Sequence, residues 1–218
     1  MPLPSLALAA AALLATIVPL APAAAGDAAA PVRIVALGDS LTAGYGLGPG
    51  EGFAPRLEAA LRAKGIDAVV VDAGVSGDTT AGGLARLDWS VGPDADAVIV
   101  ELGANDMLRG VDPAATGRNL DAIVARLRAR GLPVLVAGMR AAPNLGADYA
   151  GAFDALYAAV AERHGARLYP FFLDGVAADP GLNLGDGMHP TAAGVDVIVA
   201  RILPAVEALV VDAEADPA

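Results

Sequence analysis

The 218-residue chain contains no cysteine. This absence excludes disulfide scaffolds, thiolate nucleophiles, zinc knuckles and iron–sulfur clusters. Basic residues are also scarce, because 14 Lys and Arg stand against 25 Asp and Glu, which gives a formal net charge of −11. Such an acidic surface repels phosphate backbones and argues against a nucleic-acid partner. Aromatic residues make up 4% of the chain and hydrophobic residues 56%, so the composition predicts a folded core of small aliphatic side chains rather than a disordered chain.

The N-terminal segment has no charged side chain over residues 1–25. Its apolar stretch, residues 6–20, is followed by small residues up to Ala25, a pattern typical of a secretory signal peptide cleaved at that position. The rival interpretation is a membrane anchor, but a span needs about 20 apolar residues, and this stretch is shorter and broken by Pro19 and Pro22. We therefore expect an exported, periplasmic or secreted bacterial protein without a stable membrane anchor.

The rest of the chain alternates between two periodicities. Short apolar runs bounded by turn residues predict buried strands at residues 32–37, 68–71, 97–102, 134–137 and, interrupted by Pro170, 167–172. Between them, apolar residues at helical spacing predict helices around Leu57, Leu120, Tyr157 and Ile198, with Pro204 kinking the last. This alternation predicts one three-layer α/β domain over residues 31–211, with a five-stranded parallel sheet. Residues 212–218 are acidic and small, and we expect a frayed tail there.

Informative polar residues follow the predicted strands. Ser40 comes after the first strand, Gly77 after the second and Asn105 after the third, while Asp186 and His189 precede the last helix. Ligand sites in doubly wound sheets lie at the carboxyl ends of the strands. We therefore expect these residues to meet at one edge of the sheet.

A serine becomes a nucleophile when a base reaches its hydroxyl, and the chain has only two histidines. His164 stands beside Gly165 at the end of a helical stripe, where a cation complements the helix dipole, so we expect a structural role for it. His189 precedes Pro190, which restricts it to extended geometry. Asp186, three residues earlier, is close enough to orient the imidazole, although an Asp there also suits a turn.

An oxyanion requires preorganised donors, which backbone N–H groups and an Asn amide supply. Ser40, Gly77 and Asn105 are candidates for this role. Taken singly, each also fits a structural role, Ser40 as a cap, Gly77 as a positive-φ turn and Asn105 as a turn residue.

Four segments of the chain, in order, resemble the four sequence blocks of the SGNH (GDSL) hydrolases. They are Gly38-Asp39-Ser40-Leu41, Gly77 in Ser-Gly-Asp-Thr, Gly103-x-Asn105-Asp106 and Asp186-x-x-His189-Pro190. The resemblance extends over about residues 33–209. Within the superfamily, the chain most resembles the exported bacterial thioesterase I/lysophospholipase and arylesterase branch. One departure is Asp72, where relatives often carry Asn.

The resemblance implies a flavodoxin-like fold and a serine esterase that hydrolyses acyl or aryl (thio)esters through an acyl-enzyme. It implies Ser40 as nucleophile, His189 as base, Asp186 as its partner, and oxyanion donors from Ser40, Gly77 and Asn105. It also implies that an acyl groove is lined by Met107, Leu108, Pro143 and Leu145, although these residues equally suit anchoring of loops to the core. The sequence does not name the leaving group, so aryl esters, acyl thioesters and lysophospholipids all stay open.

Two other functions stay open beside the esterase. SGNH relatives also remove acetyl groups from carbohydrates, although such a low aromatic content offers little for sugar stacking. A secreted ligand-binding protein without chemistry is the third interpretation, since fold alone does not imply function. Residues 179–186 do not match the calcium-loop pattern, and residues 44–52 match neither phosphate-loop pattern. We therefore expect no metal and no cofactor. The expected partner is a small-molecule ester, and we expect no obligate protein partner.

Overall fold

The computed structural model describes Met1 and residues 30–215. The predicted signal peptide therefore lies, apart from Met1, outside the described residues, as do residues 216–218 of the predicted tail. Within the described part of the chain, no helix has both the length and the apolarity needed to cross a membrane.

Five parallel strands form the predicted sheet. In chain order they are β1 Val32–Gly38, β2 Ala68–Gly74, β3 Ala97–Glu101, β4 Val134–Ala137 and β5 Arg167–Tyr169. Their spatial order is β2-β1-β3-β4-β5, and every neighbouring pair is parallel, which confirms the predicted α/β fold. The last strand ends at Tyr169 and does not reach Phe172, because Pro170 has no N–H to donate to the ladder.

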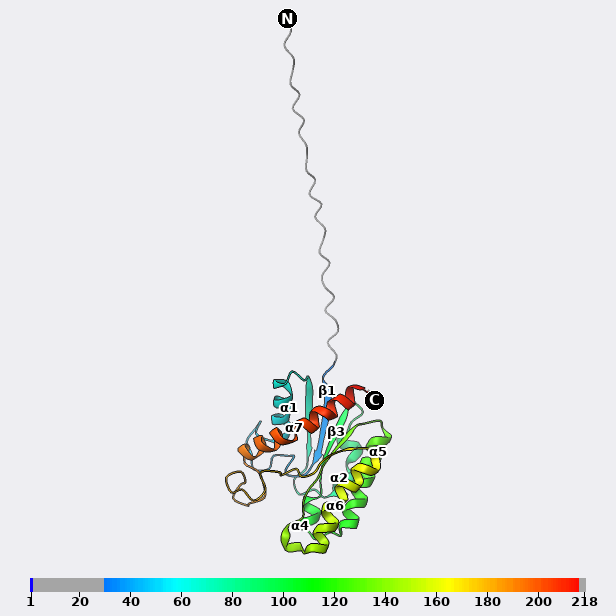
Figure 1. The fold of residues 1–218 in the computed structure, drawn as a ribbon, viewed down its shortest axis with the longest axis vertical. Helices are drawn as coiled ribbons and strands as arrows, with labels where there is room; N and C mark the ends of the chain where they lie inside the picture. The colour runs from blue at the N-terminus through cyan, green and yellow to red at the C-terminus, as the bar shows by residue number, and fades with distance from the viewer. Residues whose placement is uncertain (2–29, 216–218) are drawn as a thin grey trace.

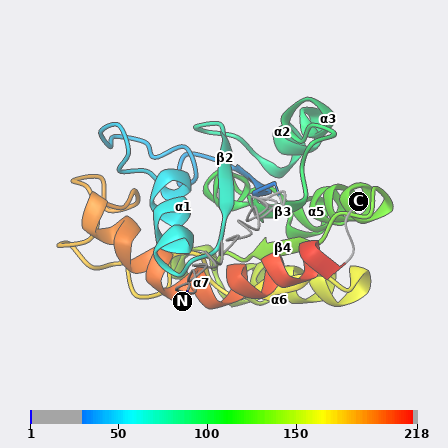
Figure 2. The same cartoon turned by 90° about the horizontal axis from the view of Figure 1, so that it is seen from above.

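Helices cover both faces of this sheet. They are α1 Phe53–Ala63, α2 Thr80–Ala85, α3 Leu87–Ser90, α4 Ala104–Leu108, α5 Pro113–Ala129, α6 Ala147–His164 and α7 Ala192–Ala215, with a 3₁₀ turn η1 Pro143–Leu145. Helices α1 and α7 pack together on one face and α5 and α6 on the other. In Figure 2, α1 lies to the left of β2, and α2, α3 and α5 lie to its right.

Local signals explain where two of the longer helices begin and end. Asp112 caps α5 by accepting the Ala114 N–H at 3.0 Å, and Pro113 supplies a first residue that needs no donor partner. Gly165 ends α6 in a left-handed conformation, with φ 59°, that a side chain would disfavour.

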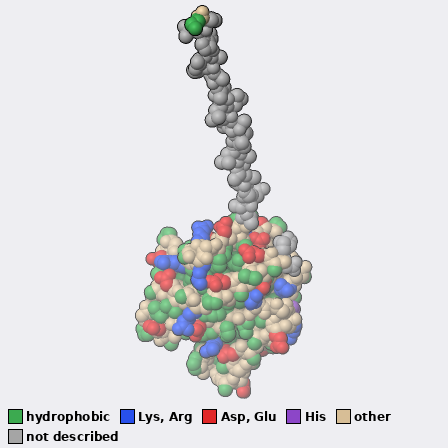
Figure 3. Space-filling view, turned by 45° about the horizontal axis from the view of Figure 1, so that its top comes forward, with side chains coloured by type: hydrophobic (Ala, Val, Ile, Leu, Met, Phe, Trp, Pro, Cys, Tyr) green, Lys and Arg blue, Asp and Glu red, His purple; other side chains and the backbone are tan. Residues whose placement is uncertain are grey.

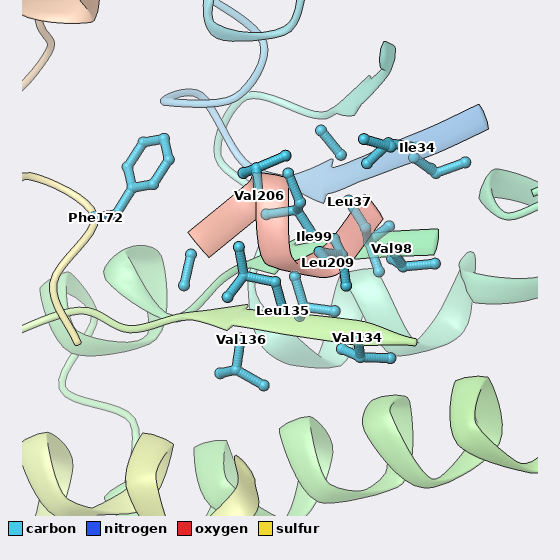
Figure 4. Close-up of a cluster of buried hydrophobic side chains, with 14 of the residues drawn as sticks. Ile34, Leu37, Val98, Ile99, Val134, Leu135, Val136, Phe172, Val206 and Leu209 are labelled. Atoms are coloured by element: carbon cyan, nitrogen blue, oxygen red, sulfur yellow. The ribbon is translucent and has the colours of Figure 1, made fainter. Parts of the chain in front are cut away.

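Alternate residues of the central strands point to opposite helical layers. Figure 4 shows Leu135 of β4 on the same side as Val206 and Leu209 of α7, whereas Val134 and Val136 point away from them. All five side chains are buried, with at most 1% exposure. Both faces of β4 are thus covered, as expected for a continuous apolar run in a parallel sheet.

The last helix is longer than the sequence predicted. It runs to Ala215, so residues 212–215 are helical instead of frayed. Asp212 explains the difference, because its carboxylate accepts from the Arg167 guanidinium of β5, with an Nη2–Oδ1 distance of 2.7 Å. The helix also continues through Pro204, although this residue has no N–H for the carbonyl of Ala200.

Acidic and basic side chains are interspersed with apolar ones on the face that Figure 3 shows. On that face the excess negative charge is therefore spread out and forms no single acidic patch.

Candidate active site

The strand order reverses direction between β1 and β3, because the chain passes from β1 outward to β2 and then returns to β3. Ligands of doubly wound folds bind at the carboxyl ends of the strands at this switch point. Ser40 follows β1 and Asn105 lies in α4, directly after β3. Figure 1 shows β1 descending from the top of the domain and α4 at its lower end.

Three side chains stand in a hydrogen-bonded row at this edge. The Ser40 Oγ lies 2.9 Å from the His189 Nε2, and the His189 Nδ1 lies 2.6 Å from an Asp186 carboxylate oxygen. Ser40 and His189 are 149 positions apart in the chain, so the fold brings them together. A carboxylate on Nδ1 fixes the tautomer that leaves Nε2 free to accept a proton from serine.

Asp186 is held by its own turn. One of its carboxylate oxygens accepts the backbone N–H groups of Met188 and His189, at 2.9 and 3.0 Å. These two bonds, and then the imidazole itself, hold the pKa of Asp186 below its ordinary value. The carboxylate is therefore ionised at neutral pH. The turn is closed by the Leu184 N–H, which donates to the His189 carbonyl at 2.7 Å.

The three residues predicted to supply oxyanion donors lie at one pocket. Ser40, Gly77 and Asn105 all line one pocket with His189. Among the described residues, the backbone N–H groups of Ser40 and Gly77 have no acceptor. Gly77 has φ 81°, a left-handed backbone that suits glycine. The Asn105 amide nitrogen donates one hydrogen to Asp39 at 2.9 Å and keeps a second N–H for a ligand.

Two buried carboxyl groups beneath this site had no role in the sequence-based interpretation. Asp39 is 0% exposed and Glu101 1%. The Glu101 Oε2 accepts the Thr42 hydroxyl at 2.8 Å and the Asp39 N–H at 3.4 Å. One sequence signal existed, because Glu101 is a charge inside the apolar run at residues 97–102, and a buried charge needs a partner.

The pocket itself has a volume of about 550 Å³. Its lining is mainly apolar beyond the polar residues already named, and includes Met107, Leu108, Met139, Pro143, Phe171 and Leu173. Leu145, the fourth predicted groove residue, does not line it. It is the last residue of η1 and packs, half-buried, against the core instead.

Two further residues beside the site, Tyr45 and Arg109, received no individual role from the sequence. The Tyr45 ring lies 4.5 Å from the His189 ring, tilted by 39°. The Arg109 guanidinium donates to the Gly77 carbonyl at 2.7 Å and so connects the end of α4 to the loop after β2. His164 does not line this pocket. It is the last residue of α6, and its Nε2 lies 2.9 Å from the Asp121 carboxylate of α5.

A doubly wound α/β fold with a Ser-His-Asp row at its switch point is typical of serine hydrolases. The chain belongs to the GDSL-like lipase/acylhydrolase family, whose model matches residues 36–197. It is 40% identical over 182 residues to the esterase TesA of Pseudomonas aeruginosa, covering 83% of this chain and 90% of the relative.

Two further similar proteins also carry the names of ester hydrolases. The chain is 37% identical over 164 residues to the thioesterase 1/protease 1/lysophospholipase L1 of Escherichia coli, covering 75% of this chain and 77% of the relative. Among solved structures, AlinE4, an SGNH-hydrolase family esterase, superposes with a TM-score of 0.70 at 49% identity, covering 82% of this chain and 96% of AlinE4. The chain is thus a serine ester hydrolase of the SGNH type, which confirms the resemblance of the four sequence blocks.

Proposed function

We propose that Ser40, His189 and Asp186 carry out the ester hydrolysis. The Ser40 Oγ attacks the acyl carbonyl while His189 Nε2 takes the hydroxyl proton. His189 then gives this proton to the departing alkoxide or thiolate, which leaves an acyl-enzyme. Water attacks the acyl-enzyme by the same steps in reverse and releases the acid. The observation that carries this proposal is the hydrogen-bonded row at 2.9 and 2.6 Å.

The oxyanion that forms at each tetrahedral stage is stabilised by the N–H groups of Ser40 and Gly77 and by the Asn105 amide. Within residues 30–215, the backbone N–H groups of Ser40 and Gly77 have no acceptor, and the Asn105 amide has one N–H beyond the one that it donates to Asp39. Donors fixed before the reaction stabilise developing charge without reorganisation.

The substrate is an ester or thioester with an apolar acyl chain. Met107, Leu108 and Pro143 line the pocket beside Ser40, and burial of each methylene contributes about 0.8 kcal/mol to binding. The apolar lining favours this substrate over an acetylated carbohydrate, which would need polar and aromatic contacts. The uncharged segment at residues 1–25 supports export of the enzyme to the periplasm or medium.

The test is hydrolysis of p-nitrophenyl esters from acetyl to palmitoyl by the wild type and Ser40→Ala. We expect activity to vanish in Ser40→Ala and the wild-type kcat/KM to peak at a medium or long chain. Equal rates in both proteins would refute Ser40 as nucleophile. An acetyl-only profile would contradict the acyl-groove assignment and favour the deacetylase.

A further inference from the structure

We propose that Asp39 and Glu101 form a buried carboxyl pair that positions Asn105 for the oxyanion, with the negative charge on Asp39 and the proton on Glu101. This inference rests on the proposed function of Asn105. Neither carboxyl touches the pocket, so both are positioning residues rather than catalytic ones.

The two carboxyl groups differ in the donors that face them. The Asp39 oxygens accept the Leu41 N–H at 3.0 Å and the Asn105 amide at 2.9 Å, one donor to each oxygen. In Glu101, Oε2 accepts two donors, while the buried Oε1 has no partner in the described part of the chain. An ionised carboxylate with one bare buried oxygen is costly, so the charge belongs on Asp39.

A proton on the Glu101 Oε1 leaves Oε2 free to accept from Thr42 and from the Asp39 N–H. Burial, and then the charge of Asp39, raise the pKa of Glu101 well above its ordinary value, which agrees with a neutral acid. Burial also raises the pKa of Asp39, to about 6, while the Leu41 and Asn105 donors oppose this rise. At neutral pH the pair therefore holds one charge.

An ionised Asp39 can only accept hydrogen bonds. The Asn105 amide must then turn its nitrogen, and not its oxygen, toward Asp39, which leaves the second N–H of the same nitrogen for the oxyanion. A flipped amide would present its carbonyl oxygen to the developing negative charge and repel it. Asp39 thus selects the catalytically useful orientation of Asn105.

Glu101 acts one step further from the reaction. By accepting from the Asp39 backbone and the Thr42 hydroxyl, it fixes the turn that contains Ser40, in which the Ala43 N–H donates to the Asp39 carbonyl at 3.0 Å. Gly38 leaves the space for this contact, because a Cβ there would lie 2.8 Å from the Glu101 Oε2.

The experiment is a double-mutant cycle on a p-nitrophenyl ester that the wild type hydrolyses well. We expect Asn105→Ala to lower kcat by about 100- to 1,000-fold. Asp39→Asn should lower kcat by about 10- to 100-fold with KM almost unchanged, since it misorients one donor without removing it. In the Asn105→Ala background, Asp39→Asn should change kcat by less than about threefold, because the group it positions is gone.

Glu101 supplies the second arm. Glu101→Leu should lower kcat, and Glu101→Gln, which mimics the neutral acid, should restore most of it. Asp121→Asn, which removes a carboxylate that pairs with Arg163 and His164 between α5 and α6, away from the pocket, is the matched control and should leave the rate unchanged. Folding of every variant is checked by thermal melting.

The outcomes separate the two proposals. Loss of activity in Ser40→Ala and Asn105→Ala but full activity in Asp39→Asn would overturn the positioning role and leave the proposed function standing. Additive effects of Asp39→Asn and Asn105→Ala would also overturn it. A Glu101→Gln variant as impaired as Glu101→Leu would place the charge on Glu101 and refute the assigned protonation. Activity in Ser40→Ala would instead remove the proposed function itself.

Discussion

Gly38, the last residue of β1, shows how closely single residues are packed around the site. A Cβ at this position would lie 1.9 Å from the Thr42 Oγ1 and 2.6 Å from the Thr42 Cβ. The neighbouring Glu101 carboxyl is also within 2.8 Å. The glycine is therefore required by space and not by backbone conformation, and it lets the Ser40 turn fold back against β3.

Gly38→Ala should lower the free energy of unfolding by about 1–3 kcal/mol, because the extra methyl group overpacks a buried site. We expect kcat to fall as well, since the turn that it displaces carries Ser40. Thermal melting and ester hydrolysis measure the two effects. Gly151→Ala in α6 is the matched control, because its Cβ meets nothing within 4 Å and alanine favours a helix by about 1 kcal/mol. An unchanged melting temperature in Gly38→Ala would contradict this packing argument.

Individual site residues differed in how far sequence could identify them. The sequence predicted that Ser40 and His189 come together, because a chain with two histidines offers few bases and because both residues stand in loops next to strands or helices. The role of Asp39 was not found, because it depends on a side-chain contact with Asn105, 66 positions away. Leu145 was expected in the acyl groove but lies outside the pocket lining, and an apolar loop residue carries no sequence signal for which way it faces.

At the scale of elements, strands were easier to predict than helix ends. Apolar runs predicted where all five strands begin, most clearly for β3 and β4, whose residues are all buried, and less well for the half-buried β5, which ends at Tyr169. The end of α7 was missed because Asp212 and Arg167 are 45 positions apart, and their pairing adds a helical turn that local composition does not predict. The short helix α4 was likewise not predicted, because five residues make too few turns to show a periodic pattern of apolar residues.

The link between α4 and the loop after β2 leads to a prediction at this scale. Arg109→Ala removes the guanidinium that holds the Gly77 carbonyl, so the Gly77 N–H should lose its fixed position. We expect kcat to fall by up to about tenfold. Stability should change by less than about 0.5 kcal/mol, because the contact is exposed.

The measurement is kcat on a p-nitrophenyl ester beside thermal melting. Arg118→Ala, an exposed arginine on α5, is the control for loss of a surface cation. If both arginine variants kept wild-type kcat, the Arg109 contact would have no part in holding the oxyanion donor.

Across the whole molecule, two groups of carboxyl residues respond to pH with opposite sign. Hydrogen bonds lower the pKa of Asp121, Asp186 and Asp212, so these groups stabilise the fold above about pH 4, and this contribution is lost as pH falls further. Burial raises the pKa of Asp39 and Glu101, so the folded chain keeps their protons at a pH where the unfolded chain has lost them. Their contribution to stability therefore falls as pH rises.

The pH dependence of unfolding tests this balance. Asp39 shifts from an ordinary pKa of 3.8 to about 6, so the free energy of unfolding should decrease between these values, by about 3 kcal/mol at most, as the buried group ionises. We expect the melting temperature of the enzyme to decline from about pH 4 to pH 6 and Asp39→Asn to flatten this decline. Asp121→Asn should leave the decline intact and instead reduce the loss of stability below about pH 4. If the melting temperatures of the wild type and Asp39→Asn changed with pH in the same way between about pH 4 and pH 6, Asp39 would not titrate in this window. Burial would then not be what sets its protonation.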